Sequence, residues 1–338
     1  MSGPQRRLAG WGFEGVHVTP PAALLAWLAE RLGGGTPTAV SAPRLTSLPR
    51  PRKLPRLPGV SSKEPLARLA RARGQGLPDL LWLRSGAVPA LPDAVAWPAE
   101  EEVGPLLAAC AGAGVRVVLR GGGTSVTGGV NVLAGDGPVV VADLERLAGL
   151  VALDGVSRLA TFRAGTRGPA LEAALAPYGL ALGHLPQSWE LSTVGGWAVT
   201  RSAGQESLGQ GRIEDLVAGA ELVAPGGRLV LPSQPASAAG PELRRLVLGS
   251  EGRLGVVTRV TLRVRPAPPR REVVAWLLPD WGGGLAAARA LVQDGVPLTM
   301  LRLSDQPESA AALLVGLGAG GDLGADLVRR YLHWRGVG

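Results

Sequence analysis

The fold of this chain is decided by one stretch, Val117-Val-Leu-Arg-Gly-Gly-Gly-Thr-Ser-Val-Thr-Gly-Gly-Val-Asn131. The β-branched run that leads into it predicts a buried strand, and the strand stops at three consecutive glycines. Three glycines in a row forgo side-chain contacts and cost backbone entropy, so a compensating role is expected. Bare N–H groups can close around an anion, and Thr124, Ser125 and Thr127 add hydroxyl donors. The stretch therefore predicts a cradle for a phosphate or pyrophosphate, with a plain glycine-rich turn as the alternative.

Two common phosphate loops do not fit this cradle. A Walker loop needs Lys after its last glycine, but Gly128 is followed by Gly129. The Rossmann pattern needs a third glycine at the position that Val126 occupies. The loop is therefore neither of these two phosphate loops.

Two further blocks combine glycines with hydroxyl groups. The first is Gly183-His-Leu-Pro-Gln-Ser-Trp-Glu-Leu-Ser-Thr-Val-Gly-Gly-Trp-Ala-Val-Thr-Arg-Ser-Ala-Gly204 with Gly211-Arg-Ile-Glu-Asp-Leu-Val217, and the second is Gly249-Ser-Glu-Gly-Arg-Leu-Gly-Val-Val257. With the loop at 119–129, they resemble the FAD-binding family of vanillyl-alcohol oxidase and p-cresol methylhydroxylase (PCMH) type. The first block resembles its alkyldihydroxyacetonephosphate synthase branch in particular. The similarity runs from about Ala94 to Pro266.

This resemblance implies an α+β fold, in which a two-subdomain PCMH-type FAD-binding domain is followed by the start of an α/β substrate cap domain. The expected division is an N-terminal helix and a basic, Pro- and Arg-rich arm in residues 1–92, the FAD-binding domain in 93–268, and a partial cap in 269–338. A complete cap in this family is longer, so the chain is expected to be C-terminally truncated. FAD is the implied cofactor. Non-covalent binding is expected, because the glycine loop has no His and Cys110 lies on the preceding helix.

The resemblance also implies which residues contact FAD. Residues 187–193 and 200–203 are expected around the pyrophosphate and the isoalloxazine edge, and residues 251–257 on the adenine and ribose side. Ser192 and Thr193 are also candidates for capping a helix, and Arg201 could orient a phosphate or a carboxylate. A bulky residue at Gly122 or Gly123 is expected to abolish flavin retention and to leave the fold largely intact. The full expected set is Arg120, Gly121, Gly122, Gly123, Thr124, Ser125, Thr127, Gly128, Gln187, Ser188, Glu190, Ser192, Thr193, Gly195, Gly196, Thr200, Arg201, Ser202, Ala203, Glu251, Gly252, Leu254, Gly255, Val256 and Val257.

Two residues are candidates for catalysis. His184 could bond a substrate oxygen or tune the charge near the flavin, with a structural histidine bonded to the backbone as the alternative. Arg302 lies in Leu301-Arg-Leu-Ser-Asp305, which resembles the start of the family's cap, and either faces the active site or pairs with an acid. No metal site is expected, because the chain has three histidines and no Cys/His spacing typical of zinc.

The branch implies an acyl-for-alkyl exchange in ether lipid synthesis, with an adduct at flavin N5 and no net redox change. The family's acid–base Tyr and its run of histidines have no match in this chain, whose only tyrosines are Tyr178 and Tyr331. Two alternatives stay open. One is a FAD-dependent D-2-hydroxy-acid oxidase or dehydrogenase, and the other is a non-catalytic FAD-binding remnant.

The net charge of +8 is concentrated between Arg44 and Arg73, where nine Lys or Arg accompany one acid. Interleaved prolines and the lack of aromatic residues there argue against nucleic-acid binding and predict an extended, solvated arm. The single Cys excludes an intramolecular disulfide, and we find neither a signal peptide nor an apolar run of membrane-spanning length, so a cytoplasmic protein is expected. The expected partner is a small-molecule substrate, with no nucleic acid, no integral membrane segment and a homodimer left open.

Hydrophobic periodicity predicts the order of secondary structure. Helices are expected at 20–32, 64–72, 98–112 and 167–178, hairpins at 151–164 and 218–231, and strands at 80–83, 93–97, 115–119, 139–142 and 256–264. The partial cap is expected to contain strand 272–278, helix 284–293 and strand 298–303, followed by a final helix at 325–334.

Overall fold

The computed structural model describes residues 5–33, 48–87, 90–235 and 238–318. The chain divides into two compact units. The first unit contains residues 1–14 and 40–268, and the second contains residues 15–39 and 269–338. This division differs from the expected three segments, because β1 pairs with β2 and thereby places the part of the arm around 60–62 in the first unit.

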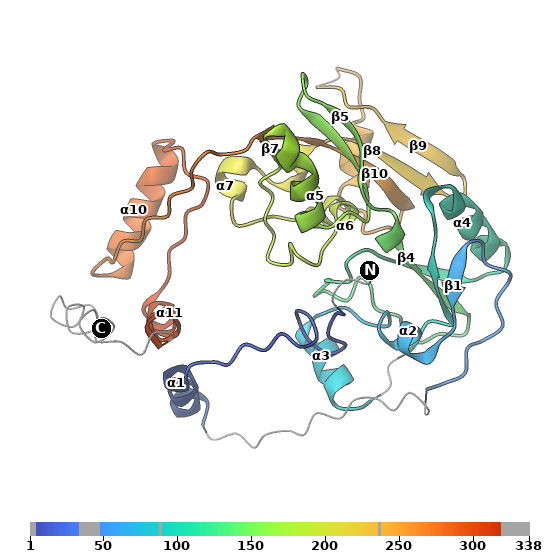
Figure 1. Cartoon of the computed structure of the whole chain (residues 1–338), viewed down its shortest axis with the longest axis horizontal. Helices are drawn as coiled ribbons and strands as arrows, with labels where there is room; N and C mark the ends of the chain where they lie inside the picture. The colour runs from blue at the N-terminus through green and yellow to red at the C-terminus, as the bar shows by residue number, and fades with distance from the viewer. Residues whose placement is uncertain (1–4, 34–47, 88–89, 236–237, 319–338) are drawn as a thin grey trace. The chain divides into compact units, whose positions relative to one another are not determined.

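The first unit is rich in short strands (Figure 1). Its strands are β1 Val60–Ser62, β2 Ala94–Trp97, β3 Arg116–Arg120, β4 Val139–Asp143, β5 Leu150–Asp154, β6 Leu159–Arg163, β7 Leu180–Ala181, β8 Val217–Ala224, β9 Gly227–Leu231, β10 Val256–Arg263 and β11 Arg265–Pro266. Its helices are α2 Pro65–Leu69, α3 Leu77–Arg84, α4 Val103–Gly112, α5 Gly168–Leu175, α6 Val194–Thr200, α7 Ser207–Gln210, α8 Ile213–Leu216 and α9 Leu243–Val247, with 3₁₀ turns η2 Glu100–Glu102, η3 Leu144–Arg146 and η4 Ala176–Tyr178.

The first sheet has the order β1-β2-β4-β3. Strands β2 and β3 both run parallel to β4, whereas β1 is antiparallel to β2. Because β2, α4 and β3 form a βαβ unit, the glycine loop after β3 emerges at the same edge of the sheet as the end of β4. This is the edge at which open α/β sheets bind their ligands.

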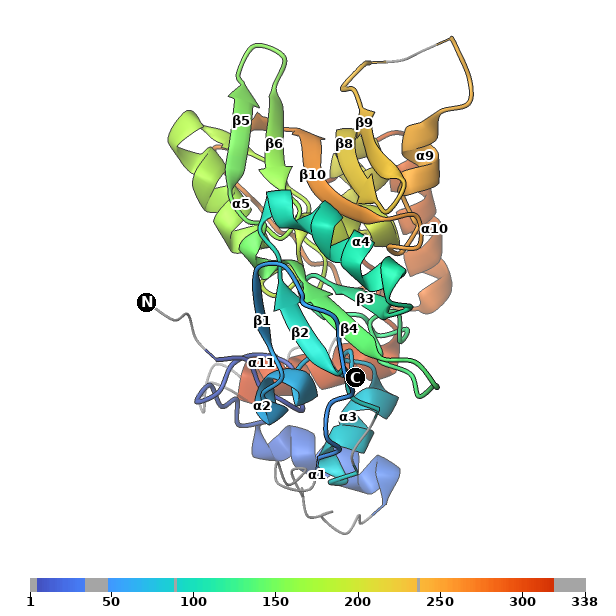
Figure 2. The same cartoon turned by 90° about the vertical axis from the view of Figure 1, so that its right-hand side faces the viewer.

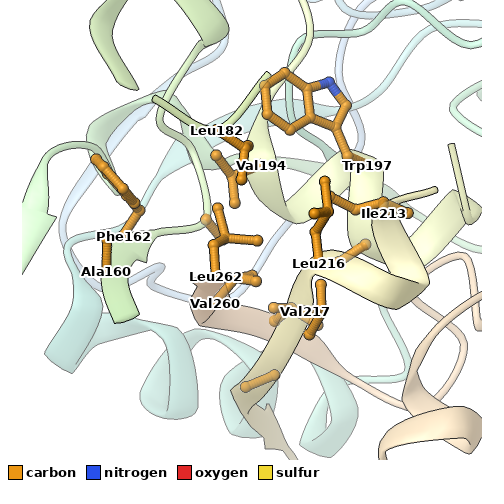
Figure 3. Packing of buried hydrophobic residues seen from close by; sticks show 14 of the residues in the cluster. Ala160, Phe162, Leu182, Val194, Trp197, Ile213, Leu216, Val217, Val260 and Leu262 are labelled. Atoms are coloured by element: carbon orange, nitrogen blue, oxygen red, sulfur yellow. The ribbon is translucent and has the colours of Figure 1, made fainter. Parts of the chain in front are cut away.

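The second sheet is antiparallel, in the order β5-β6-β10-β8-β9 (Figure 2). Alternate residues of its strands point into the largest core of the molecule, where they meet side chains from α5, α6 and α8. Figure 3 shows Phe162, Leu262 and Trp197 packed within this core. The sheet therefore fixes the position of α6, which lies within the block at 183–204.

Helix α4 connects the two sheets. Leu106 and Cys110 pack on the first sheet, whereas Val103 and Leu107 pack with Leu144 and with Val256 of β10. The helix thus has two apolar faces, as its high apolar content requires. Cys110 is buried and free, and its burial raises the pKa of the thiol.

Most expected elements of the first unit are confirmed, including both hairpins, the strand at 256–264 and the helices before and after the glycine loop. The strand expected at 80–83 is wrong, because these residues lie in α3. Pro78 in its first turn and Asp79 at its positive end favour a helix there, and a short apolar run does not by itself distinguish the two structures.

The second unit contains α1 Ala22–Leu32, α10 Trp281–Gln293 and α11 Gln306–Gly318, and α1 packs against α11 (Figure 1). The expected helix of the cap is confirmed by α10, but the strands expected at 272–278 and 298–303 are wrong, since neither segment forms a sheet among the described residues. A strand needs a partner for its backbone groups, and apolar periodicity does not supply one. The final helix expected at 325–334 lies outside the described residues. None of the described helices has the length and hydropathy that a membrane span needs.

The basic arm is not simply solvated. Arg68 is 3% exposed and donates to the carbonyl oxygens of Pro92 and Pro49. Arg52 donates to those of Gly135 and Gly137. Within the described part of the arm, the guanidinium groups of these two arginines attach the arm to the first unit through hydrogen bonds to backbone carbonyl oxygens.

We predict that Phe162→Ala destabilises the first unit by about 3–5 kcal/mol, because the ring is fully buried and its removal leaves a cavity. The measurement is the free energy of unfolding from urea denaturation. Val156→Ala is the control, because Val156 is 97% exposed in the β5–β6 turn and its truncation should change stability by less than about 0.5 kcal/mol. Equal losses from both variants would contradict this description of the core.

Candidate functional site

The first unit contains a cavity of about 340 Å³. Three segments that are distant in sequence line it: the glycine loop after β3, the segment around α6, and the turn before β10. The volume lies in the range of small-molecule sites. The lining residues are Leu119, Gly121, Gly122, Gly123, Thr124, Ser125, Val126, Thr127, Gly129, Val130, Leu144, Ala164, Pro186, Ser188, Ser192, Thr193, Gly195, Gly196, Trp197, Val199, Thr200, Ser202, Glu251, Gly252, Gly255 and Val257.

The glycine loop presents unused backbone donors. Within the described residues, the amide N–H groups from Gly122 to Thr127 donate no hydrogen bond. The loop takes part in hydrogen bonds through its carbonyl oxygens: Gln75 N donates to Ser125 O at 2.8 Å. Gly122 and Gly123 are buried, and buried backbone donors are almost always paired in proteins, so their free amides beside the cavity indicate an anionic ligand.

The glycines are required by the contact between two loops. An ideal Cβ on Gly122 would lie 2.0 Å from Leu191 O and 2.7 Å from Ser192 Cα. One on Gly121 would lie 2.3 Å from Thr193 Oγ1. This corrects the expectation that a bulky residue at Gly122 leaves the fold largely intact. The clash is with backbone that cannot move away easily, so the loop packing itself would be disturbed.

The hydroxyl groups at the start of α6 have separate roles. Thr193 is the N-cap of the helix, and its Oγ1 accepts from Gly196 N at 3.4 Å. Ser192 Oγ accepts from Trp197 Nε1 at 2.7 Å and donates to Ser188 O at 2.8 Å. The capping role expected for both residues therefore applies to Thr193 only, whereas Ser192 holds the indole of Trp197 beside the cavity.

His184 is buried, with 1% of its surface exposed. Its Nε2 lies 2.7 Å from Ser202 Oγ, its ring meets the Trp197 ring edge-on with centroids 5.2 Å apart, and its Nδ1 has no hydrogen-bond partner among the described residues. Burial lowers the pKa of His184 to about 4, so the imidazole is neutral at pH 7. His184 itself does not line the cavity, but Ser202 does. The histidine thus contacts the cavity through one serine hydroxyl.

The block at 249–257 lines the cavity just before β10 and at its start. Glu251 has a φ of 49°, a left-handed conformation that non-glycine residues rarely adopt, and its N–H donates to Val199 O at 3.0 Å. Gly255 has a φ of 145°, and a Cβ there would lie 2.6 Å from Val223 O. The turn is therefore fixed against both α6 and β8.

Several expected cofactor-binding residues do not line the cavity. Arg201 is one: its guanidinium donates to Leu248 O at 3.0 Å and to Arg245 O at 2.9 Å, and its contact with a phosphate stays a prediction. Arg302 lies in the second unit and forms an ion pair with Glu308 there, as its structural alternative predicts. The expected cofactor-binding residues outside the lining are Arg120, Gly128, Gln187, Glu190, Arg201, Ala203, Leu254 and Val256.

Other lining residues were not expected from the sequence. Leu144 directly follows β4 and Ala164 directly follows β6, so each occupies a strand end that faces the cavity. The position of a residue just after a predicted strand was a usable signal for both. Trp197 lies within the block at 183–204 and could have been included as a neighbour of Gly196.

Comparison with known proteins identifies the ligand class of this cavity. A family model described as FAD binding domain matches residues 92–231, which include two of the three lining segments. Residues 92–231 are therefore an FAD-binding domain of this family. The resemblance stated from the sequence is thereby confirmed, and FAD is the cofactor that the family binds.

Two relatives of this FAD-binding chain are synthases. An alkyldihydroxyacetonephosphate synthase of Dictyostelium discoideum is 32% identical over 281 residues, covering 82% of this chain and 46% of that protein. The synthase of Caenorhabditis elegans is 31% identical over 282 residues, covering 81% and 47%. A solved structure of an alkyldihydroxyacetonephosphate synthase has a TM-score of 0.84 at 26% identity, covering 98% of this chain and 66% of that one. The chain thus spans about half the length of the curated relatives.

A mitochondrial D-lactate dehydrogenase [cytochrome] of Arabidopsis thaliana is also similar, at 32% identity over 224 residues, which cover 65% of this chain and 39% of that protein. The names of these two kinds of relative refer to different reactions. The function of this chain therefore has to be argued from its residues.

The cavity fits FAD on its own geometry. Free amides of the glycine loop suit the diphosphate, and the apolar walls formed by Trp197, Val199 and Val257 suit a flat ring. The described lining residues include neither His nor Cys, the side chains that would tether a flavin covalently. Non-covalent binding is accordingly expected.

We predict that Gly122→Ala loses both bound flavin and stability, because its Cβ would overlap Leu191 O. Gly129→Ala is the matched control in the same loop: its Cβ would meet only the side-chain ends of Glu251, at 3.1 Å, and Ser125, at 3.6 Å. Flavin is quantified by absorbance after acid release, and stability by thermal unfolding of the flavin-free protein. A Gly122→Ala protein with normal unfolding temperature and full flavin would show that the loop contact is not required.

We predict a pH dependence of stability from His184. The pKa in the folded protein, about 4, lies below the usual value of 6.5, so neutral His184 favours the folded state. This contribution is complete above pH 6.5 and is lost as the pH falls from 6.5 toward 4, by up to about 3 kcal/mol. His184→Gln should flatten that part of the pH profile of the unfolding free energy. Parallel profiles for the wild type and His184→Gln would contradict the shift.

Proposed function

We propose that this chain provides the flavin-binding part of an enzyme of the alkyldihydroxyacetonephosphate synthase type, which exchanges the acyl group of an acyl dihydroxyacetone phosphate for a long-chain alkoxide. The observation that carries this proposal is the extent of the structural similarity. The FAD domain model ends at 231, whereas the likeness to the solved synthase covers 98% of the chain. In sequence, the Dictyostelium synthase is similar over 82% of the chain and the D-lactate dehydrogenase over 65%.

Bound FAD would supply an electrophilic, redox-capable ring, and the chain's residues would hold and shield it. The amides of the glycine loop would bind the diphosphate, and the apolar wall around Trp197 would exclude water from the ring. No residue of the second unit is given a role at this site, and the catalytic assignment of Arg302 stays a prediction.

Ser202 is the polar group best placed to contact a reacting molecule. It lines the cavity, and its hydroxyl is bonded to His184 Nε2 at 2.7 Å. Because His184 is neutral at pH 7, its ring can serve as donor or as acceptor according to its tautomer. In both cases the bond fixes how the serine hydroxyl faces the cavity, so we assign His184 a positioning role and Ser202 the contact.

The second candidate function is D-2-hydroxy-acid oxidation, which the similarity to the D-lactate dehydrogenase supports. It differs in an observable way. Oxidation of a hydroxy acid reduces and bleaches the flavin, whereas the exchange involves no net redox change. A chain that binds FAD and does neither would fit a non-catalytic role.

The test offers the FAD-loaded chain an acyl dihydroxyacetone phosphate with an isotopically labelled long-chain alcohol, and separately a D-2-hydroxy acid without oxygen. We expect labelled alkyl product by mass spectrometry and no bleaching. The rate should be low, because the chain has no match to the family's acid–base residues and such residues contribute about 10²–10⁴-fold. Bleaching by the hydroxy acid would favour the second candidate, and absence of both reactions would overturn the proposal for this chain.

We further predict that Ser202→Ala lowers the exchange rate roughly tenfold at unchanged flavin content, about the loss expected when one hydrogen bond to a reacting group is removed. Ser157→Ala is the matched control, because Ser157 is exposed in the β5–β6 turn. If the two variants retain equal rates, Ser202 has no part in the reaction.

A further inference from the structure

A segment near the N-terminus reaches the glycine loop. Residues 5–14, here called the N-terminal strap, belong to the first unit and are closed on themselves by the bridge between Arg6 and Phe13. Arg84 Nε attaches the strap to α3 by donating to Ala9 O at 3.0 Å. From this strap, Arg6 Nη1 donates to the carbonyl oxygen of Gly122, 116 residues further along the chain.

A second guanidinium, that of Arg120, packs against the same loop. Arg120 is 6% exposed, and its Nη1 donates to Arg73 O at 3.0 Å. Its Cζ would lie 2.2 Å from a Cβ on Gly123, so the guanidinium packs directly against that glycine. Arg120 does not line the cavity, and therefore it lies behind the loop that does.

Asp143 and Glu145 act on these two arginines only through longer-range electrostatics. Neither forms an ion pair with a described residue, and Nη2 of Arg6 is buried without a hydrogen-bond partner there. The nearest acids, Asp143 and Glu145, are engaged by Arg71, at 3.0 and 3.5 Å. Burial lowers the pKa of both Arg6 and Arg120, the latter to about 10.

Unpaired buried charge is costly, so a compensating anion is expected close by. The glycine loop that these arginines contact lines the cavity, and its amides from Gly122 to Thr127 donate no hydrogen bond among the described residues. A peptide group is planar and trans, so its C=O and N–H point in opposite directions. Because Arg6 holds the Gly122 carbonyl on the strap side, the N–H of Gly123 is directed away from the strap.

We propose that Arg6, with Arg120 behind it, supplies the counter-charge and the loop orientation for the diphosphate of FAD, without touching the ligand. Arg6 is thus a positioning residue of the cofactor site, contributed by the N-terminal strap. The inference rests on FAD binding by the first unit and is independent of the exchange reaction proposed above.

The test measures the dissociation constant of FAD for the flavin-free chain, by quenching of flavin fluorescence at low and at high salt. Arg6→Gln should raise the constant about tenfold at low salt, and the loss should shrink at high salt because a charge interaction is screened. Arg6→Lys should recover part of the affinity, since it restores the charge. ADP, which carries the diphosphate without the flavin ring, should show the same order of variants.

Arg84→Gln is the matched control, because it removes a strap anchor and an equal charge away from Gly122. We expect it to bind FAD as the wild type does. An equal loss in Arg84→Gln and Arg6→Gln would reduce Arg6 to a strap anchor and overturn the proposal, as would unchanged affinity in Arg6→Gln. Failure of the wild type to bind FAD would overturn the FAD assignment together with this inference, whereas absent exchange activity would affect only the proposed function.

Discussion

The contact between the glycine loop and residues 191–193 is the constraint on which the cavity depends. A Cβ on Gly122 would lie 2.0 Å from Leu191 O, so the two backbones meet without space for a side chain. The contact requires β3 and α6 to be placed first; β3 belongs to the first sheet, whereas α6 packs in the core of the second sheet. Helix α4, which packs on both sheets, therefore indirectly sets the geometry of the ligand site. The shape of the site in this unit thus depends on the packing of its cores.

The buried polar groups around the cavity fall into two kinds. His184 is buried without a counter-charge and stays neutral, as its lowered pKa shows. Arg6 and Arg120 cannot lose their charge at neutral pH, so their environment has to tolerate it. An anionic cofactor relieves that cost, and binding to the folded state alone stabilises it by mass action. Flavin binding and folding of the first unit are consequently expected to be coupled through the glycine loop.

Local elements of the first unit were predictable because their signals are local. The turns at 154–155 and 225–227 and the proline before η2 act within a few residues, and the elements they bound are where they were expected. The errors have a common cause. Residues 80–83, 272–278 and 298–303 are short apolar runs, which become strands only if another strand pairs with them. That pairing is a property of the fold.

The sequence by itself indicated that a strand ends in a glycine loop suited to a phosphate, because that pattern lies in adjacent residues, although the strand is half-buried and not buried. FAD and the grouping of the two later blocks with this loop followed from the resemblance that the three blocks carry. Only the tertiary structure decided which side chains serve that site. It turned Arg201 toward the backbone carbonyls of residues 245 and 248, joined His184 to Ser202, and brought Arg6 to Gly122 across 116 residues. Hydrophobic periodicity reports which face of an element is buried, but a long polar side chain finds its partner in space, and nothing along the sequence marks it.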